Sequence, residues 1–215
     1  TTGQRNIAIG YQAMDDTDAG TNSAGSNDNM FIGYLAGSGT WANTNSTGNV
    51  ALGNYSMDAA MDDADYNTAV GFYALSALTT GNQNVALGRD ALLSLTTGGD
   101  NIAIGAYAGD AMTDNSSNTV VGYYAFTTAD SGENSNVVIG ASAGSTINNS
   151  SADNNVIIGE SAGSGGTGDL SRAVIIGSSA GNSTGASDNE GMIAIGWSAL
   201  TALTTGARNV AVGYE

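Results

Sequence analysis

The sequence contains no cysteine and no histidine, and both absences restrict its chemistry. Without cysteine the chain forms no disulfide and offers no thiolate to a metal ion. Without histidine it lacks the most common general base and a frequent metal ligand. Carboxylates remain, but Glu133, Glu160 and Glu190 are scattered and no motif pairs them. We therefore expect neither an enzyme nor a cofactor in this chain.

Basic residues are almost absent as well. Arg5, Arg89, Arg172 and Arg208 oppose 20 acidic residues, which gives a net charge of −16. Nucleic acids and anionic membrane surfaces attract clusters of Lys and Arg, so this composition argues against both as partners. No apolar run approaches the roughly 20 residues that cross a bilayer, and we expect no membrane insertion.

Glycine is abundant, with 32 residues, and twelve of them occupy the same place in one short motif that recurs along the chain. The motif is Asn, apolar, Ala or Val, aliphatic, Gly, two variable residues and then Ala, as in residues 84–91. The twelve repeat glycines are Gly10, Gly33, Gly53, Gly71, Gly88, Gly105, Gly122, Gly140, Gly159, Gly177, Gly196 and Gly213. They are 17 to 23 residues apart. A near-constant period is typical of a stacked repeat, in which each unit contacts only its neighbours.

Each copy predicts two short strands. In one copy Ile102 and Ile104 would point to one face of a strand, which we assign to the core, and Ala103 to the other face. The repeat glycine that follows permits a bend or a close backbone approach that a side chain would block. Residues 106–109 predict a second strand, and the polar connectors, several with Thr-Thr-Gly, supply turns.

A copy of about 17 residues is too short for a helical repeat, which takes about 30. We therefore predict an all-β fold, a parallel β-solenoid of about twelve short coils. Coils about 4.8 Å apart would form a rod of roughly 55 Å. We treat residues 1–215 as one repeat array and, because its first and last copies are incomplete, expect a segment of a longer fibre protein.

Stacking places like residues on like, so the motif asparagines are predicted to form a ladder of side-chain amides. Such a ladder would satisfy backbone groups of the turns in one coil after another. Two rungs lack the amide, where Ala173 and Met192 replace asparagine. The predicted ladder consists of Asn6, Asn29, Asn49, Asn67, Asn84, Asn101, Asn118, Asn136, Asn155 and Asn209.

The residue assigned to the outward face of the strand is apolar in every copy, including Phe31. Strands that are apolar on both faces are buried on both faces, and a long exposed apolar column is avoided by monomers. We therefore expect an oligomer around a central axis, with wider packing from Val138 to Ile175, where the column is larger. An ordinary β-sandwich is the alternative, which the regular period disfavours. The interface candidates are Ala8, Ala51, Ala69, Ala86, Ala103, Val120, Val138, Ile157, Ile175, Ala194 and Ala211.

Three copies carry a family resemblance: Asn-Val-Ala-Leu-Gly at 84–88, Asn-Ile-Ala-Ile-Gly at 101–105 and Asn-Thr-Ala-Val-Gly at 67–71. They resemble the head repeats of trimeric autotransporter adhesins, whose chains are left-handed parallel β-rolls packed three abreast. The longer form at 72–81 looks still more like the repeats of phage tail fibres. The resemblance implies a homotrimer, although connectors longer than those of the adhesin heads leave its geometry open.

The resemblance also implies a function. The implied function is that of a structural and adhesive segment of an extracellular fibre. The fibre is a virion tail fibre, and the segment presents surfaces for host attachment. The partners implied are further copies of the chain and a host-surface glycan or protein. The alternative is the head of a trimeric adhesin on a bacterial cell surface. An ice-binding solenoid needs a flat array of threonines, and a fibre-borne polysaccharide depolymerase needs paired carboxylates; the sequence favours neither.

Two connectors rich in aspartate are the candidates for metal binding, because calcium prefers oxygen ligands. Their spacing does not match a calcium loop, and solvated acidic loops that keep the chain soluble are the alternative. The candidate ligands are Asp15, Asp16, Asp18, Asp62, Asp63 and Asp65.

Aromatic residues supply the remaining candidates. Trp41 lies among small polar residues of the connector 38–48 and is the candidate receptor contact, either stacking on a sugar or anchoring a partner. The alternative is that it folds back over the coil. Other aromatics recur just after the repeat glycine, and we interpret them as packing and rim residues: Tyr11, Tyr34, Phe72, Tyr73, Tyr107, Tyr123, Tyr124, Trp197 and Tyr214.

Overall fold

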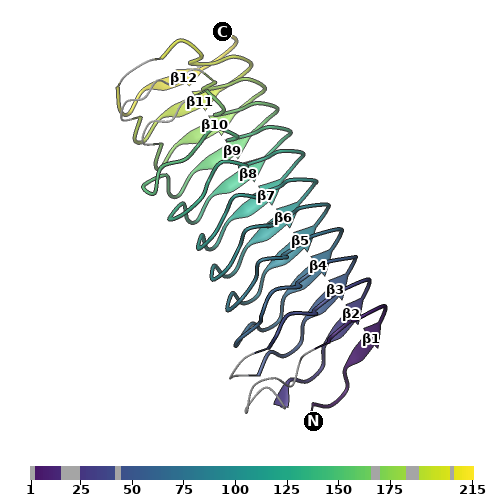
Figure 1. Cartoon of the computed structure of the whole chain (residues 1–215). Coiled ribbons are helices and arrows are strands. Elements are labelled where there is room, and N and C mark those ends of the chain that lie inside the picture. Colours follow the sequence, from purple (N-terminus) through teal and green to yellow (C-terminus); the bar gives the residue numbers. More distant parts are fainter. Residues whose placement is uncertain (1–2, 16–24, 42–44, 166–169, 183–188, 204–205) are drawn as a thin grey trace.

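The chain forms a rod of stacked coils with its two termini at opposite ends (Figure 1). The structure is a computed structural model that describes residues 3–15, 25–41, 45–165, 170–182, 189–203 and 206–215. Each coil contributes one strand of three residues. The strands are β1 (Ile7–Ile9), β2 (Met30–Ile32), β3 (Val50–Leu52), β4 (Thr68–Val70), β5 (Val85–Leu87), β6 (Ile102–Ile104), β7 (Thr119–Val121), β8 (Val137–Ile139), β9 (Val156–Ile158), β10 (Val174–Ile176), β11 (Ile193–Ile195) and β12 (Val210–Val212).

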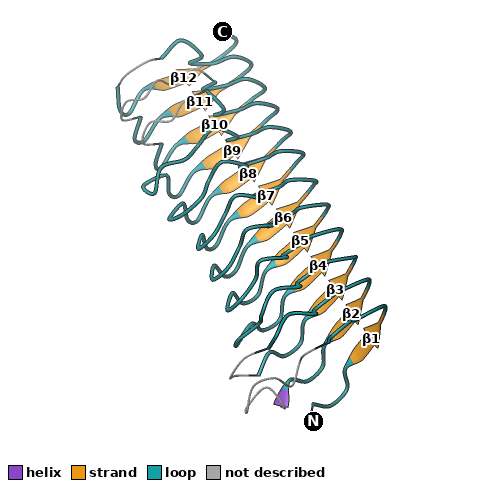
Figure 2. Ribbon diagram, in the orientation of Figure 1, coloured by secondary structure: helices purple, strands orange, loops and turns teal. Residues whose placement is uncertain are grey.

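The strands form a single parallel sheet of twelve, in sequence order from β1 to β12. The register places equivalent residues side by side, so that Ala86 pairs with Ala103 and Ala103 with Val120. Figure 2 shows the strands stacked along one side of the rod, with loops and turns closing each coil. The prediction of an all-β parallel β-solenoid is confirmed.

The prediction that each copy contains a second strand is wrong. Residues 106–109 form turns, in which Tyr107 and Gly109 both have a φ of +59°. The coils nevertheless remain bonded there, because Tyr107 N donates to Arg89 O at 2.9 Å and Gly109 N donates to Ala125 O at 3.0 Å. The two bonds run to opposite neighbouring coils.

The repeat glycines are required by close backbone contact between coils. Gly88 has a φ of +142°, and a Cβ atom built on it would lie 2.5 Å from the carbonyl oxygen of Gly105. The same clash recurs along the column, for example between Gly53 and the carbonyl of Gly71 at 2.2 Å. Any side chain at these positions would therefore push adjacent coils apart, as the sequence predicted.

The assignment of inner and outer strand faces is wrong. The middle residue of each strand from β2 to β11, predicted to face outward, is buried inside its own coil. The interior has room for one side chain from each strand, because buried residues of the turns fill the other side. At the two ends of the sheet Ala8 is exposed and Ala211 half-buried. The predicted interface residues that are buried are Ala51, Ala69, Ala86, Ala103, Val120, Val138, Ile157, Ile175 and Ala194.

Two side-chain positions of each coil share the space of the core. The mid-strand residue shares this space with the residue four places after the repeat glycine, and in several coils one of the two is large where the other is small. The coil of β5 combines Ala86 with Leu92, whereas the coil of β9 combines Ile157 with Gly163. A Cβ atom on Gly163 would lie 3.4 Å from Ile157. The larger column from Val138 to Ile175 is thus accommodated inside the rod, and the predicted widening between chains does not follow.

The predicted asparagine ladder is present and runs unbroken from Asn6 to Asn155. In a typical rung, Asn101 Nδ2 donates to Asn84 Oδ1 at 3.0 Å and to the turn carbonyl of Asn115 at 2.7 Å. Its Oδ1 atom accepts bonds from the backbone and side-chain nitrogens of Asn118 at 3.0 and 3.2 Å. Each buried amide therefore joins three coils. At the first missing amide, Ala173 N still donates to Asn155 Oδ1 at 2.9 Å.

Candidate functional site

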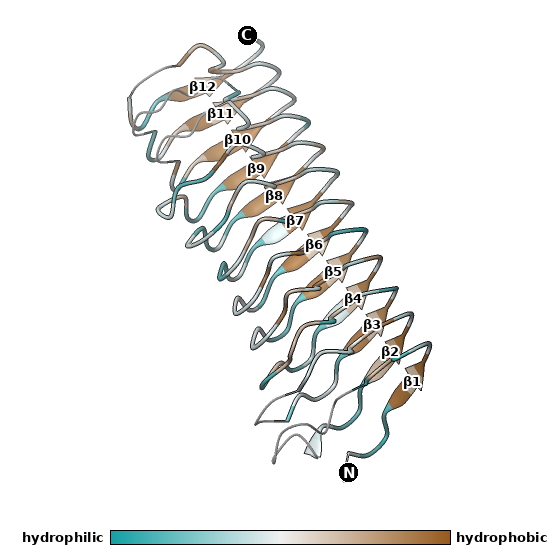
Figure 3. Cartoon of the chain, viewed as in Figure 1, coloured by the Kyte–Doolittle hydropathy of each residue, from teal (hydrophilic) through white to brown (hydrophobic). Residues whose placement is uncertain are grey.

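The strands present one continuous apolar surface to the outside. The first and third residues of each strand, which we call the sheet face, offer 24 positions, and 22 of them are Ile, Val, Leu or Met. Thr68 and Thr119 are the two polar exceptions, and β4 and β7 are accordingly paler than their neighbours in Figure 3. No charged residue occurs on the sheet face, although the chain carries a net charge of −16.

Water reaches the sheet face along the whole rod. Every position on it is exposed or half-buried. In the central coils, where both neighbours are present, Leu87 is 46% exposed and Ile102 is 41% exposed. A contiguous apolar surface of this length is typical of an interaction site and not of a solvent-facing one. Sequence reasoning recognised an apolar strip but placed it on the wrong face of the strands.

Trp41, the candidate receptor contact, is buried. Its ring packs edge-on against Phe31 with centroids 5.6 Å apart, and its Nε1 atom donates to Gly37 O at 3.2 Å. It occupies the core position that Leu78 and Leu95 occupy in other coils. The alternative, that Trp41 folds back over the coil, is therefore correct. Gly37 leaves space for the ring of Phe31, since a Cβ atom there would lie 2.4 Å from that ring.

The aspartate candidates that the structure describes are not gathered into a cluster. Within the ranges that the structure describes, no group of three or more acidic side chains is close enough to share a metal ion. Asp65 instead serves the backbone: its Oδ1 accepts a bond from Thr47 N at 2.6 Å. Asp153 does the same for Asn134 N at 2.6 Å. Asp15, Asp62 and Asp63 lie on turns, and Asp16 and Asp18 fall outside the described residues.

Three partly or fully buried carboxyl groups have altered acidity. Burial raises the pKa of Asp58 and of Asp110, while hydroxyl donors, Ser76 at 2.7 Å from Asp58 and Thr127 beside Asp110, partly oppose the effect. Burial also raises the pKa of Glu133, whose Oε1 has no hydrogen-bond partner. Its Oε2 accepts a bond from Asn115 Nδ2 at 2.7 Å. All three lie in different coils, and each is engaged by its own neighbour.

The first threonine of the connectors at 79–81 and 96–98 is engaged within the rod. Thr79 Oγ1 donates to Thr96 O at 3.0 Å, and Thr96 Oγ1 donates to Thr113 O at 2.9 Å. These hydroxyls belong to a column that joins successive coils. A flat array of free threonine hydroxyls, which ice binding would need, is therefore not formed by this column.

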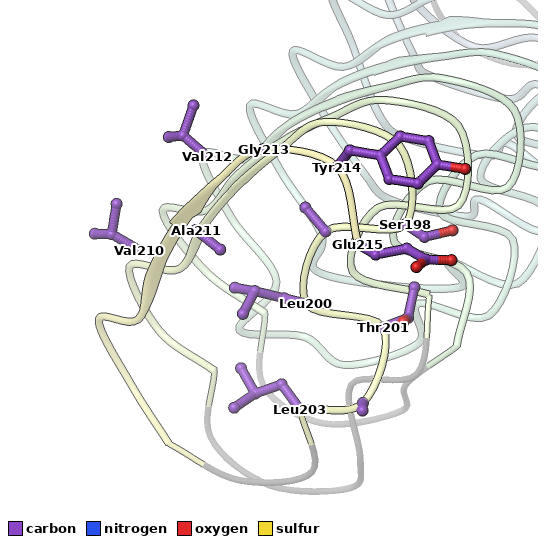
Figure 4. Close-up of a pocket in the computed structure, with 12 residues that line it drawn as sticks. Ser198, Leu200, Thr201, Leu203, Val210, Ala211, Val212, Gly213, Tyr214 and Glu215 are labelled. Atoms are coloured by element: carbon purple, nitrogen blue, oxygen red, sulfur yellow. The ribbon is translucent and has the colours of Figure 1, made fainter.

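At the C-terminal coil, a pocket of about 760 Å³ opens beneath β12 (Figure 4). Its apolar wall contains Leu200, Leu203 and Ala211, which are the positions that form the core in other coils. It is the open interior of the coil and gives no evidence for a ligand. Figure 4 also shows Val210 and Val212 pointing to one side of the coil and Tyr214 to the other.

Among the described residues, no helix has the length and apolar character needed to cross a membrane. No protein-family model matches the chain, and comparisons with curated proteins and with solved structures gave no significant match.

Proposed function

We propose that the chain is a structural segment of an extracellular fibre, in which three copies associate side by side through their sheet faces. The observation that carries this proposal is the uncharged apolar sheet face on a strongly acidic rod. Association of chains that each carry −16 is least costly where no charges meet, and the sheet face is that place. Burial of its Ile, Val and Leu side chains supplies the driving force.

The number three comes from the resemblance to adhesin heads and phage tail fibres, which also implies a left-handed coil. A flat face on each of three rods would turn toward a common axis and leave the remaining surface in water. Parallel rods give a stiff fibre that holds attachment surfaces away from its anchor. We place this segment in a virion tail fibre, and a bacterial surface adhesin is the alternative. The proposal assigns no catalysis to the segment.

Light scattering behind a sizing column tests the proposal. We expect a mass near three times the chain mass of 21.3 kDa. The paired substitution Ile102→Glu and Ile104→Glu, in the middle of the sheet face, should shift the mass to that of the monomer. Thr80→Glu with Thr97→Glu adds the same charge at exposed positions outside the strands and should leave the mass unchanged. A monomeric unsubstituted chain at micromolar concentration would contradict the proposal.

A further inference from the structure

Aromatic side chains follow the repeat glycine in six of the first seven coils, and Arg89 stands there in the coil of β5. We call this row, completed by Arg89, the aromatic ridge. In the first four coils Tyr11 and Tyr34 stack at 5.4 Å, and Tyr55 stacks on Tyr73 at 4.8 Å. The members of the ridge are Tyr11, Tyr34, Tyr55, Phe72, Tyr73, Arg89, Tyr107, Tyr123 and Tyr124.

The fold itself does not require these rings. The coils of β8 to β10 carry only Ala, Ser or Glu at the same two positions, and Ser142 has a φ of +55°, like Tyr124 at +53°. The backbone bond is also the same, since Ser142 N donates to Tyr123 O at 2.8 Å and Tyr124 N to Ala106 O at 3.1 Å. A bulky residue is unfavourable in the left-handed region. The rings of the ridge are therefore additions to a coil that forms without them.

Rings of the aromatic ridge remain partly exposed on the outside of the rod. At the second position after the glycine the rings lie flat on one another, as in Tyr107 and Tyr124, which are 4° apart. The rings of Phe72 and Tyr123, at the first position, stand at 78° to their neighbours Tyr73 and Tyr124. Each of these two side chains is nevertheless open to water, with 42% of Phe72 and 56% of Tyr123 exposed.

Polar groups accompany the open rings. The guanidinium of Arg89 lies 4.5 Å above the ring of Tyr107 and forms a 3.2 Å ion pair with Asp90. Phenol hydroxyls, a guanidinium and a carboxylate are suited to the hydroxyl groups of sugars, and aromatic faces are suited to the C–H faces of sugar rings. The rod is too acidic to favour a polyanion. The row repeats at the coil spacing of about 4.8 Å, which favours a ligand that also repeats along a line.

From these observations we infer that the aromatic ridge binds a neutral, linear polysaccharide lying along the rod. This deepens the proposed function by naming the attachment partner and the surface that holds it. At the C-terminal coil, Tyr214 occupies the position of the first ridge ring and points away from Val210 and Val212 of the sheet face (Figure 4). The ridge thus remains accessible when the sheet face is covered by other copies.

Electrophoresis of the chain through native gels that contain dextran, mannan, galactomannan or laminarin tests the inference. At least one polysaccharide should retard the chain. Phe72→Ala with Tyr123→Ala should weaken that retardation at least tenfold in apparent Kd; alanine already occupies the first ridge position at Ala106 and Ala141. Tyr66→Ser is the matched control, because Tyr66 is 63% exposed outside the ridge and Ser117 occupies the equivalent position. This control should bind normally.

Two results would overturn the inference: no retardation by any of the four polysaccharides, or retardation that the ridge substitutions leave unchanged. Light scattering on the same variants provides a third test, since loss of the oligomer on ridge substitution would make the ridge a contact between copies. A monomer whose glycan binding depends on the ridge would contradict the proposed trimer while retaining this inference.

Discussion

At the scale of the residue, the ladder asparagines do most to hold the coils in register. From Asn29 to Asn136 each is buried and uses its amide on the coil before it, on a turn carbonyl and on the coil after it. The missing amides at Ala173 and Met192 show that one rung is dispensable for the fold. They do not show that it is free of cost, because buried polar groups that lose a partner are expensive.

Replacement of one central asparagine measures this cost. We expect Asn101→Ala to lower the free energy of unfolding by about 3 kcal/mol, since Asn118 N loses its acceptor and the turn carbonyl of Asn115 loses the donor Asn101 Nδ2. Gln83→Ser, at an exposed position on the adjoining turn, should change it by less than about 0.5 kcal/mol. Urea unfolding followed by circular dichroism makes the comparison. Equal midpoints for the two variants would contradict the structural role of the ladder.

Glu133 gives a prediction about pH. Its folded pKa is raised chiefly by burial, so the carboxyl group favours the folded rod when protonated. Its contribution is fully present below the unfolded pKa of about 4.3 and is lost as pH rises through the higher folded value. Glu133→Gln should therefore be progressively more stable than the unsubstituted chain as pH rises from about 4.3 toward neutrality. Thermal unfolding of both chains across this range tests it; parallel pH profiles would show that Glu133 titrates normally.

At the scale of the element, the coil depends on the exchange of bulk between its mid-strand residue and the residue four places after the glycine. Ala86→Ile should overpack the coil against Leu92 and cost about 1–3 kcal/mol. Leu92→Gly alone should cost about 2–5 kcal/mol through the cavity it leaves. The double substitution reproduces the pair Ile157 and Gly163 of the β9 coil and should be more stable than the sum of the two costs predicts.

A double-mutant cycle from urea unfolding midpoints measures this coupling, and Leu87→Val, on the sheet face of the same strand, serves as a mild reference change. Strictly additive effects of Ala86→Ile and Leu92→Gly would show that the two positions do not share one space.

The same pairs explain how far the sequence predicts the coil. Period, parallel pairing, repeat glycines and the amide ladder all follow from like residues recurring at fixed positions. The inner face does not follow from alternation, because both faces of these strands are apolar and alternation identifies only which residues share a face. The usable signal was the coupled size of Phe31 with Gly37 and of Ala51 with Met57, which places the mid-strand residue in the core.

Two further predictions from the sequence are wrong for local reasons. The pattern at residues 106–109 favours a second strand, but Tyr107 and Gly109 adopt a positive φ, which the side-chain pattern does not encode. Trp41 was taken for a loop residue because its neighbours are small and polar. Its distance from the repeat glycine, close to that of Leu78 and Leu95, was the evidence for a core position.

At the scale of the whole molecule, the rod separates its surfaces by chemistry. The described acidic residues and the arginines, three of them in ion pairs, lie outside the strands. The sheet face has no charge and the aromatic ridge faces elsewhere. Such a division suits a fibre in which one face joins the copies and another meets a ligand, and it is what the proposed function requires.

The central claim is that copies of the chain cover one another's sheet faces, and disulfide cross-linking tests it most directly because the chain has no cysteine of its own. Leu87→Cys places one thiol on the sheet face, and Thr97→Cys places one at an exposed position outside the strands. After mild oxidation, a denaturing gel without reductant should show a covalent dimer for Leu87→Cys alone, because equivalent residues meet around the axis. Its absence, or equal cross-linking of both variants, would contradict the account.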